Sequence, residues 1–222
     1  MGAFAGPDIA ETGLVLALDA ADRNSYPGSG TTWTDLSGRG NNGTLTNGPT
    51  YSSANGGSIV FDGVDDYVKF GSSIQPSNLT ISIWIKPNTS ILSGGYKAIV
   101  DKSNSWYLFL FDGVPIFFIN GDANYVQSSI TLTNNWFNVV GTYNQSSILM
   151  YVNGSLVGTT NYNVAISNNS NSIELMSRSV VEGKPNNYKS SGDVSQVQIY
   201  NRALTTAEIS QNFNMLRGRF GI

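Results

Sequence analysis

The sequence contains neither cysteine nor histidine among its 222 residues. Without cysteine there can be no disulfide bond and no thiolate metal site. Without histidine the chain lacks the side chain that most often titrates near neutral pH, which is also a common zinc ligand. Catalytic triads built on either residue are therefore excluded.

Charged residues are also scarce. They make up 12% of the chain, about half of the usual share of roughly 25%. The net charge is −3, and the lysines and arginines form no cluster. Because a surface that follows a phosphate backbone needs many basic contacts, we expect no binding to nucleic acid. Asn, Ser, Thr and Gly take the place of charge, which suits a neutral extracellular or virion surface.

Long apolar runs are absent as well. No run approaches the roughly 18 residues that a membrane helix needs, so no membrane insertion is expected. The first residues have no basic segment followed by an apolar one, so the sequence predicts no signal peptide. Residues 1–12 are small, polar and interrupted by Gly and Pro. We expect them to form an N-terminal arm ahead of one domain at residues 13–222.

What the chain does contain is a series of short segments in which apolar and polar residues alternate. In the clearest, residues 79–87, Leu79 and every second residue as far as Ile85 point one way, while Trp84 points the other. Two turn dipeptides, Asp112-Gly113 and Asn153-Gly154, predict type I′ hairpins. About a dozen such strands without intervening helices predict an all-β, antiparallel two-sheet sandwich.

The pattern changes at the end of the chain. Residues 194–200 alternate as a strand does, and the capping-box sequence TTAE follows at 205–208. Ile209, Phe213 and Leu216 then recur at roughly helical spacing. The sequence therefore predicts one short C-terminal helix after the last strand.

Several motifs occur in an order typical of one family. They are NGTL at 42–45, FDGVDDYV at 61–68, ISIWIKP at 81–87, WFNVVGTY at 136–143, LMYVNG at 149–154 and IYNRALT at 199–205. Over residues 13–213 the chain resembles the laminin-G-like jelly-roll domains of the concanavalin A-like lectin/glucanase superfamily, of the type found in phage structural proteins. The resemblance implies a jelly-roll sandwich.

Many relatives carry a structural calcium ion, so the resemblance makes calcium the one candidate cofactor. Calcium takes six to eight oxygen ligands. The candidates are Asp19, Asp22 and Asp193, together with a carbonyl group. The family's closing motif G-x-I-D-E-V has two carboxylates where this chain carries Ser195 and Gln196, and this substitution weakens the expectation of calcium.

A second acidic group follows the strand at residues 58–61. Asp62, Asp65 and Asp66 lie close together in the sequence and could also offer oxygen ligands. The alternative is that Asp62 is a turn residue chosen to precede Gly63, while the other two accept hydrogen bonds from the backbone.

The related glucanases use a Glu-x-Asp-x-x-Glu strand that supplies paired carboxylates. The four glutamates of this chain are not arranged in that way. They are Glu11, Glu174, Glu182 and Glu208. We therefore expect that the protein is not an enzyme.

Binding of sugars would need aromatic platforms beside polar groups. Five aromatic residues that we place on loops are candidates for ligand binding: Tyr26, Trp33, Trp106, Tyr125 and Tyr188. The alternative for each tryptophan is a place in the core. Trp84 points away from the apolar stripe of its strand, so it is either exposed or covered by a loop.

The resemblance implies a non-catalytic phage protein on the virion surface, as a capsid decoration, head fibre or tail component. It would be made in the host cytoplasm. Its partners would be other virion proteins, copies of itself and cell-surface glycans bound by its loops. The alternative is a free-standing carbohydrate-binding module without a virion role.

Overall fold

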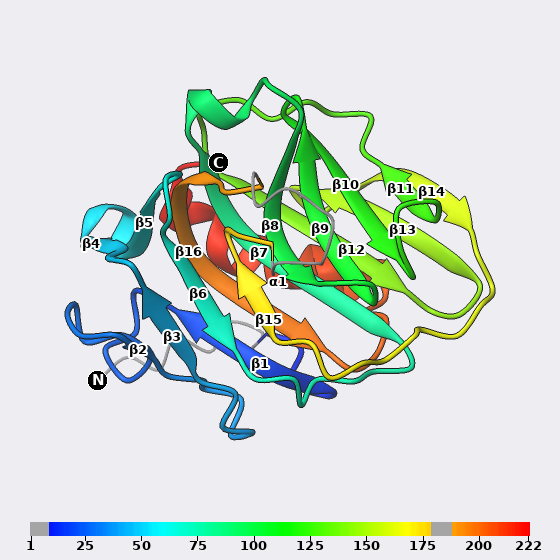
Figure 1. Cartoon of the computed structure of the whole chain (residues 1–222), viewed down its shortest axis with the longest axis horizontal. Helices are drawn as coiled ribbons and strands as arrows, with labels where there is room; N and C mark the ends of the chain where they lie inside the picture. The colour runs from blue at the N-terminus through cyan, green and yellow to red at the C-terminus, as the bar shows by residue number, and fades with distance from the viewer. Residues whose placement is uncertain (1–8, 179–187) are drawn as a thin grey trace.

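The computed structural model describes residues 9–178 and 188–222, and most of the predicted arm, residues 1–8, lies outside this part (Figure 1). Two eight-stranded antiparallel sheets and a C-terminal helix make up the described fold. The predicted sandwich with one terminal helix is thereby confirmed. Within the described residues, no helix is long and apolar enough to cross a membrane.

Sheet A has the strand order β14-β13-β12-β7-β16-β5-β4, and β1 also pairs with β16. Its strands are β14 (Ser155–Asn161), β13 (Ser147–Val152), β12 (Phe137–Tyr143), β7 (Leu79–Pro87), β16 (Ser191–Tyr200), β5 (Ser58–Asp62), β4 (Thr50–Ser52) and β1 (Leu14–Asp19). The alternation predicted for residues 79–87 is that of β7, the strand between β12 and β16.

Sheet B has the order β11-β10-β9-β8-β15-β6-β3-β2. Its strands are β11 (Tyr125–Gln127), β10 (Val114–Ile119), β9 (Trp106–Phe111), β8 (Tyr96–Lys102), β15 (Ile173–Leu175), β6 (Tyr67–Phe70), β3 (Gly43–Thr46) and β2 (Thr32–Trp33). Two short 3₁₀ helices, η1 (Ala54–Gly56) and η2 (Thr89–Ile91), lie in the connections.

Both predicted hairpins are present. Asp112 and Gly113 have φ angles of 47° and 79°, and they join β9 to β10. Asn153 and Gly154 have φ angles of 50° and 76°, and they join β13 to β14. Positive φ at both central residues defines the type I′ turn, whose twist suits two paired strands.

The main core lies between the inner faces of the two sheets, where the apolar side chains of β7 are fully buried. The sheets approach closely at Gly141 on β12. A Cβ atom added there would lie 2.6 Å from the ring of Phe117 on β10. Glycine at this position thus lets an aromatic ring from sheet B fill the space above sheet A.

Helix α1 (Thr206–Phe220) begins with the predicted capping box and covers the outer face of sheet A. The side chain of Thr205 accepts a hydrogen bond from the backbone N–H of Glu208. Trp84 of β7 stacks on Phe220 and Phe213 of the helix, with ring centroids 4.2 and 5.7 Å apart. Trp84 is therefore buried under the helix, and neither the exposed position nor the loop cover that the sequence suggested is found.

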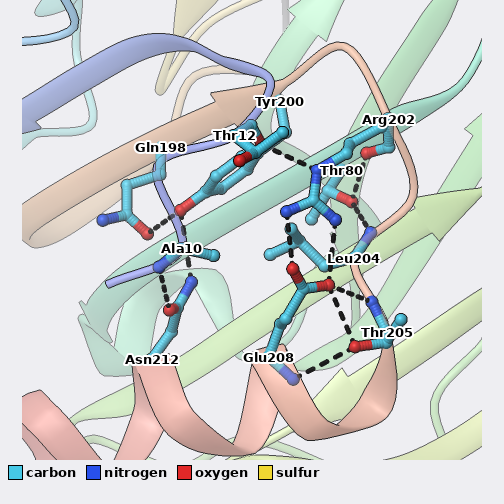
Figure 2. A network of polar contacts seen from close by, with 10 residues as sticks. All are labelled: Ala10, Thr12, Thr80, Gln198, Tyr200, Arg202, Leu204, Thr205, Glu208 and Asn212. Carbon is cyan, nitrogen blue, oxygen red and sulfur yellow. Dashed lines mark hydrogen bonds and ion pairs between the residues drawn. The ribbon is translucent and has the colours of Figure 1, made fainter. Parts of the chain in front are cut away.

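An ion pair holds the first turn of the helix to the preceding segment (Figure 2). Arg202 donates hydrogen bonds from Nη1 and Nη2 to the two carboxylate oxygens of Glu208, at 2.9 and 2.6 Å. Its Nε donates to the carbonyl oxygen of Thr12 at 2.7 Å. The hydrogen bonds from Arg202 lower the pKa of Glu208 to about 2.

A second set of contacts in Figure 2 joins the N-terminal segment, the helix and β16. The backbone N–H of Ala10 donates to Oδ1 of Asn212, and Nδ2 of Asn212 donates to the hydroxyl of Tyr200. Burial raises the pKa of Tyr200 to about 12, so this hydroxyl keeps its proton and donates to Oε1 of Gln198. The described end of the predicted arm thus lies against the domain.

Candidate functional site

The outer face of sheet B carries apolar side chains that do not belong to the main core. Tyr107 and Phe109 of β9 point outward, as do Ile116 and Phe118 of β10 and Ala98 of β8. The residues that alternate with them on β9 point inward to the core. The β9–β10 hairpin is therefore apolar on both of its faces, which is unusual for an antiparallel sheet with one face in water.

Further rings extend this surface, which we call the aromatic patch. Its residues are Tyr96, Tyr107, Phe109, Phe111, Phe118, Tyr125 and Tyr188. Tyr107 and Phe118 stack at 4.6 Å between ring centroids with an interplanar angle of 22°. Tyr96 and Tyr125 are more than two-fifths exposed at the margin of the patch. The patch thus offers both packed and accessible rings.

Arg178 lies among these rings. Its guanidinium carbon is 5.0, 5.4 and 5.5 Å from the ring centroids of Tyr107, Phe109 and Tyr188. Such distances give favourable cation–π interactions. The side chain is 7% exposed, and its Nε atom has no hydrogen-bond partner among the described residues. This Nε atom is itself buried and faces the carboxylate of Asp101, so the other guanidinium nitrogens are the ones that a bound molecule can reach.

Two carboxylates accompany Arg178. Oδ1 of Asp101 is 3.9 Å from Nε, and Oδ1 of Asp122 is 4.0 Å from Nη2. The hydroxyl of Tyr107 donates a hydrogen bond to Oδ1 of Asp122. Burial, together with this hydrogen bond, raises the pKa of Tyr107 well above its ordinary value. The phenol therefore stays protonated and holds the Asp122 carboxylate at the edge of the patch.

These side chains enclose a cavity of about 100 Å³, which we call the aromatic hollow. It is lined by Tyr96, Tyr107, Phe109, Phe118, Asp122, Arg178 and Tyr188. The cavity is smaller than the roughly 300 Å³ or more of a pocket that encloses a drug-sized ligand. It therefore suits one ring or side group of a larger molecule, with aromatic faces for stacking and Asp122 and Arg178 for hydrogen bonds.

The sequence matches the profile of a known family over residues 62–210, and that family is described as the concanavalin A-like lectin/glucanases superfamily. The chain belongs to this superfamily. The match covers most of both sheets, so the resemblance carried by the sequence motifs is confirmed. A search of curated proteins finds no match.

Solved structures with the same fold include binding domains of clostridial toxins. The binding domain of Paraclostridial Mosquitocidal Protein 1 has a TM-score of 0.71 and 20% identity, with 91% of this chain and 52% of that chain covered. The binding domain of botulinum neurotoxin DC in complex with SialylT has a TM-score of 0.70 and 17% identity, and the match covers 93% of this chain and 52% of that chain.

A third structure is the ligand-binding domain of botulinum neurotoxin serotype D in complex with N-acetylneuraminic acid. Its TM-score is 0.70 at 18% identity, and the match covers 92% of this chain and 51% of that chain. The present chain thus spans about half the length of these neighbours. At such identities the likeness shows the fold.

Of the five aromatic residues that the sequence singled out, the concanavalin A-like fold brings Tyr125 and Tyr188 together in the aromatic patch. Trp33 and Trp106 are fully buried in the main core. Tyr26 is also buried, and its hydroxyl donates to the carbonyl oxygen of Gly30 at 2.8 Å. These three rings therefore stabilise the fold. For the two tryptophans this is the core position that the sequence offered as the alternative.

The three calcium candidates are not brought together. Asp19 forms an ion pair with Arg219 at 2.8 Å, and its other oxygen accepts a hydrogen bond from Gln196. Oδ1 of Asp22 accepts from the backbone N–H of Asn24. Asp193 is half-buried on β16, and burial raises its pKa. Because a guanidinium already neutralises Asp19, this donor set does not fit a calcium ion.

Asp62, Asp65 and Asp66 form the one group of three acidic side chains in the described residues that is close enough to share an ion, with carboxylate oxygens within 4.8 Å. Oδ1 of Asp62 accepts from the backbone N–H of Val64 at 2.7 Å, and Oδ2 of Asp66 accepts from that of Asp62 at 3.1 Å. Burial raises the pKa of Asp66. These contacts match the alternative in which the aspartates build a turn.

Sequence reasoning missed Tyr107, Phe109, Phe118 and Arg178. A pattern that could have found the rings is the run of residues 106–119, where both alternating sets are apolar. No local pattern could have found Arg178. It follows β15, and only the pairing of β15 with β8 brings it to the patch.

Proposed function

We propose that this concanavalin A-like domain binds a glycan at the aromatic hollow and does not cleave it. The observation that carries the proposal is the set of rings around the buried guanidinium of Arg178 on the face of sheet B. A sugar ring has apolar C–H faces that can stack on aromatic side chains and hydroxyl groups that can both donate and accept hydrogen bonds. The hollow offers a partner for each of these features.

The neighbouring structures support a binding role. Two of them carry SialylT or N-acetylneuraminic acid, and all three are binding domains. The lining of the hollow supports a role without catalysis, since Asp122 is its one carboxylate among the described residues. Glycoside hydrolysis ordinarily needs two carboxyl groups on opposite sides of the scissile bond.

The wider setting that we propose is the surface of a phage virion, where the domain would be a capsid decoration, head fibre or tail component. The low charge and the many Asn, Ser, Thr and Gly residues support this setting, as does the family resemblance. A mass-spectrometric census of purified phage particles tests it. Absence of the protein from particles would favour a carbohydrate-binding module without a virion role.

A glycan array followed by titration calorimetry tests the binding site. Tyr96→Ala and Tyr188→Ala are expected to weaken binding by roughly 5- to 10-fold, because each removes one aromatic contact. Leu156→Ala is the matched control, since this exposed apolar side chain lies on β14 of sheet A. Equal affinities for all three variants would contradict the proposed site. Hydrolysis of a β-glucan by the pure protein would contradict the absence of catalysis.

A further inference from the structure

A second cavity adjoins the aromatic hollow, and Arg178 lines both of them. This second hollow has a volume of about 320 Å³. Its lining includes Tyr67 of β6, Glu174 of β15, and the loop residues Asp65 and Lys189. The two hollows thus lie on either side of Arg178 over sheet B, one lined from β9 and β10 and the other from β15 and β6, and we call the two together the groove.

The second hollow has the same combination of an aromatic ring and polar groups, in a more polar form. Nζ of Lys189 lies 4.3 Å from the ring centroid of Tyr67, and it donates a hydrogen bond to the carbonyl oxygen of Asp65 at 3.3 Å. Tyr67 is half-buried. Each hollow thus has at least one aromatic ring in its lining, and Arg178 lines both of them.

Negative charge exceeds positive charge along the groove. Among the described residues at or beside it, the carboxylates are those of Asp65, Asp101, Asp122 and Glu174. The cations are Arg178, Lys189 and Lys69, the last of which faces Glu174 across the β6–β15 pair. Asp122 is the most accessible of the groups around Arg178, with 56% of its side chain exposed. A ligand carboxylate that approached the guanidinium would therefore meet like charge at Asp122.

Hydroxyl groups do not meet this repulsion. Each hydroxyl can donate to a carboxylate oxygen such as those of Asp122, and it can accept from a guanidinium N–H of Arg178. A ligand that only fills the aromatic hollow would leave the second hollow unused. A longer chain of sugars could stack near Tyr67 as well.

We propose that the groove selects an uncharged oligosaccharide that spans both hollows and passes Arg178, and that it discriminates against acidic glycans. This inference rests on the proposed function. It adds two properties to it, the charge of the ligand and its length.

Charge selection is tested with an array of neutral oligosaccharides beside their sialylated counterparts, and with calorimetry on the best matched pair. The unmodified domain is expected to bind the neutral member more tightly. Asp122→Asn is expected to reduce this preference about three- to fivefold, the size of one partly screened charge interaction. Asp22→Asn is the matched control, because it makes the same charge change in a loop outside the groove.

Length is tested with neutral oligosaccharides of increasing size. The longer ligands are expected to bind more tightly, and Tyr67→Ala should weaken their binding about fivefold while it leaves the shortest ligand unaffected. Tyr51→Ala is the matched control, since Tyr51 is a half-buried tyrosine on β4 of sheet A. Thermal melting of each variant separates a lost contact from a lost fold.

The outcomes separate the two proposals. Equal or tighter binding of the sialylated member overturns the charge selection and leaves glycan binding intact. Binding that is independent of length, with no effect of Tyr67→Ala, overturns the spanning of both hollows. Binding of no glycan at all overturns the proposed function and this inference with it.

Discussion

The two outer faces of the sandwich carry similar aromatic clusters but differ in what covers them. On sheet A, Trp84 and Trp136 are covered by Phe213 and Phe220 of α1, the helix that lies behind the strands in Figure 1. On sheet B, Tyr107 and its neighbours carry no helix of the described chain. They surround Arg178 and a cavity instead.

The difference shows how one fold can use aromatic side chains for stability on one side and for binding on the other. A ring that its own helix covers is part of the core. Rings around a cavity, with a cation among them and accessible tyrosines at the margin, offer contacts that another molecule can complete. Variants that affect one face and spare the other test this distinction.

The largest effect is expected for Trp84→Ala on the covered face. Removing this fully buried ring creates a cavity beneath Phe213 and Phe220, and the free energy of unfolding should fall by about 3–5 kcal/mol. Urea denaturation measures the loss. Tyr96→Ala on the open face is the comparison, with an expected cost below about 1 kcal/mol. Similar losses for both variants would remove the distinction between the faces.

On the open face, Arg178→Lys keeps the charge but removes the planar guanidinium that lies among three rings. Glycan affinity should fall about tenfold, or about 1.4 kcal/mol. Calorimetry measures the affinity, and urea denaturation checks the fold. An unchanged affinity would place the ligand elsewhere.

The attachment of the helix should depend on pH through Glu208, whose pKa in the folded protein is lowered to about 2 from an ordinary 4.5. A lowered folded pKa means that the carboxylate stabilises the fold above pH 4.5 and that this contribution is lost as the pH falls toward 2. Glu208→Gln should reduce the free energy of unfolding by about 1 kcal/mol at neutral pH, since glutamine still completes the capping box.

Urea denaturation of this variant and the unmodified protein across that pH range measures the dependence. The difference in stability should shrink as the pH falls from 4.5 and should disappear below pH 2. A constant difference at every pH would contradict the role of the ion pair with Arg202. Glycan binding at neutral pH should be the same for both proteins, because Glu208 lies on the covered face.

Local patterns in the sequence were sufficient to predict most of the fold. The alternation at residues 79–87, the Asp112-Gly113 and Asn153-Gly154 turns, and the capping box at Thr205 each depend on neighbours in sequence. The site could not be predicted in this way. In the β9–β10 hairpin both faces are apolar. Only the packing of the two sheets therefore decides which of the two alternating sets of side chains enters the core.

The misplaced candidates have the same cause. Trp33 and Trp106 were expected on loops, yet Trp33 ends β2 and Trp106 begins β9, and both side chains point into the core. Trp84 was correctly expected to point away from the apolar stripe. Its cover came from a helix at the far end of the chain, which local alternation does not show.

The smallest effect is expected at Asp19, whose carboxylate holds Arg219 near the end of α1. If this ion pair is its role, Asp19→Asn should cost less than about 1 kcal/mol, because both partners keep some exposure to water. Millimolar calcium should leave the melting temperature of both proteins unchanged, since the donor set does not fit the ion. A rise in melting temperature with calcium, seen in the unmodified protein but not in the variant, would instead make Asp19 a calcium ligand. The anchoring of the helix on sheet A would then depend on a metal.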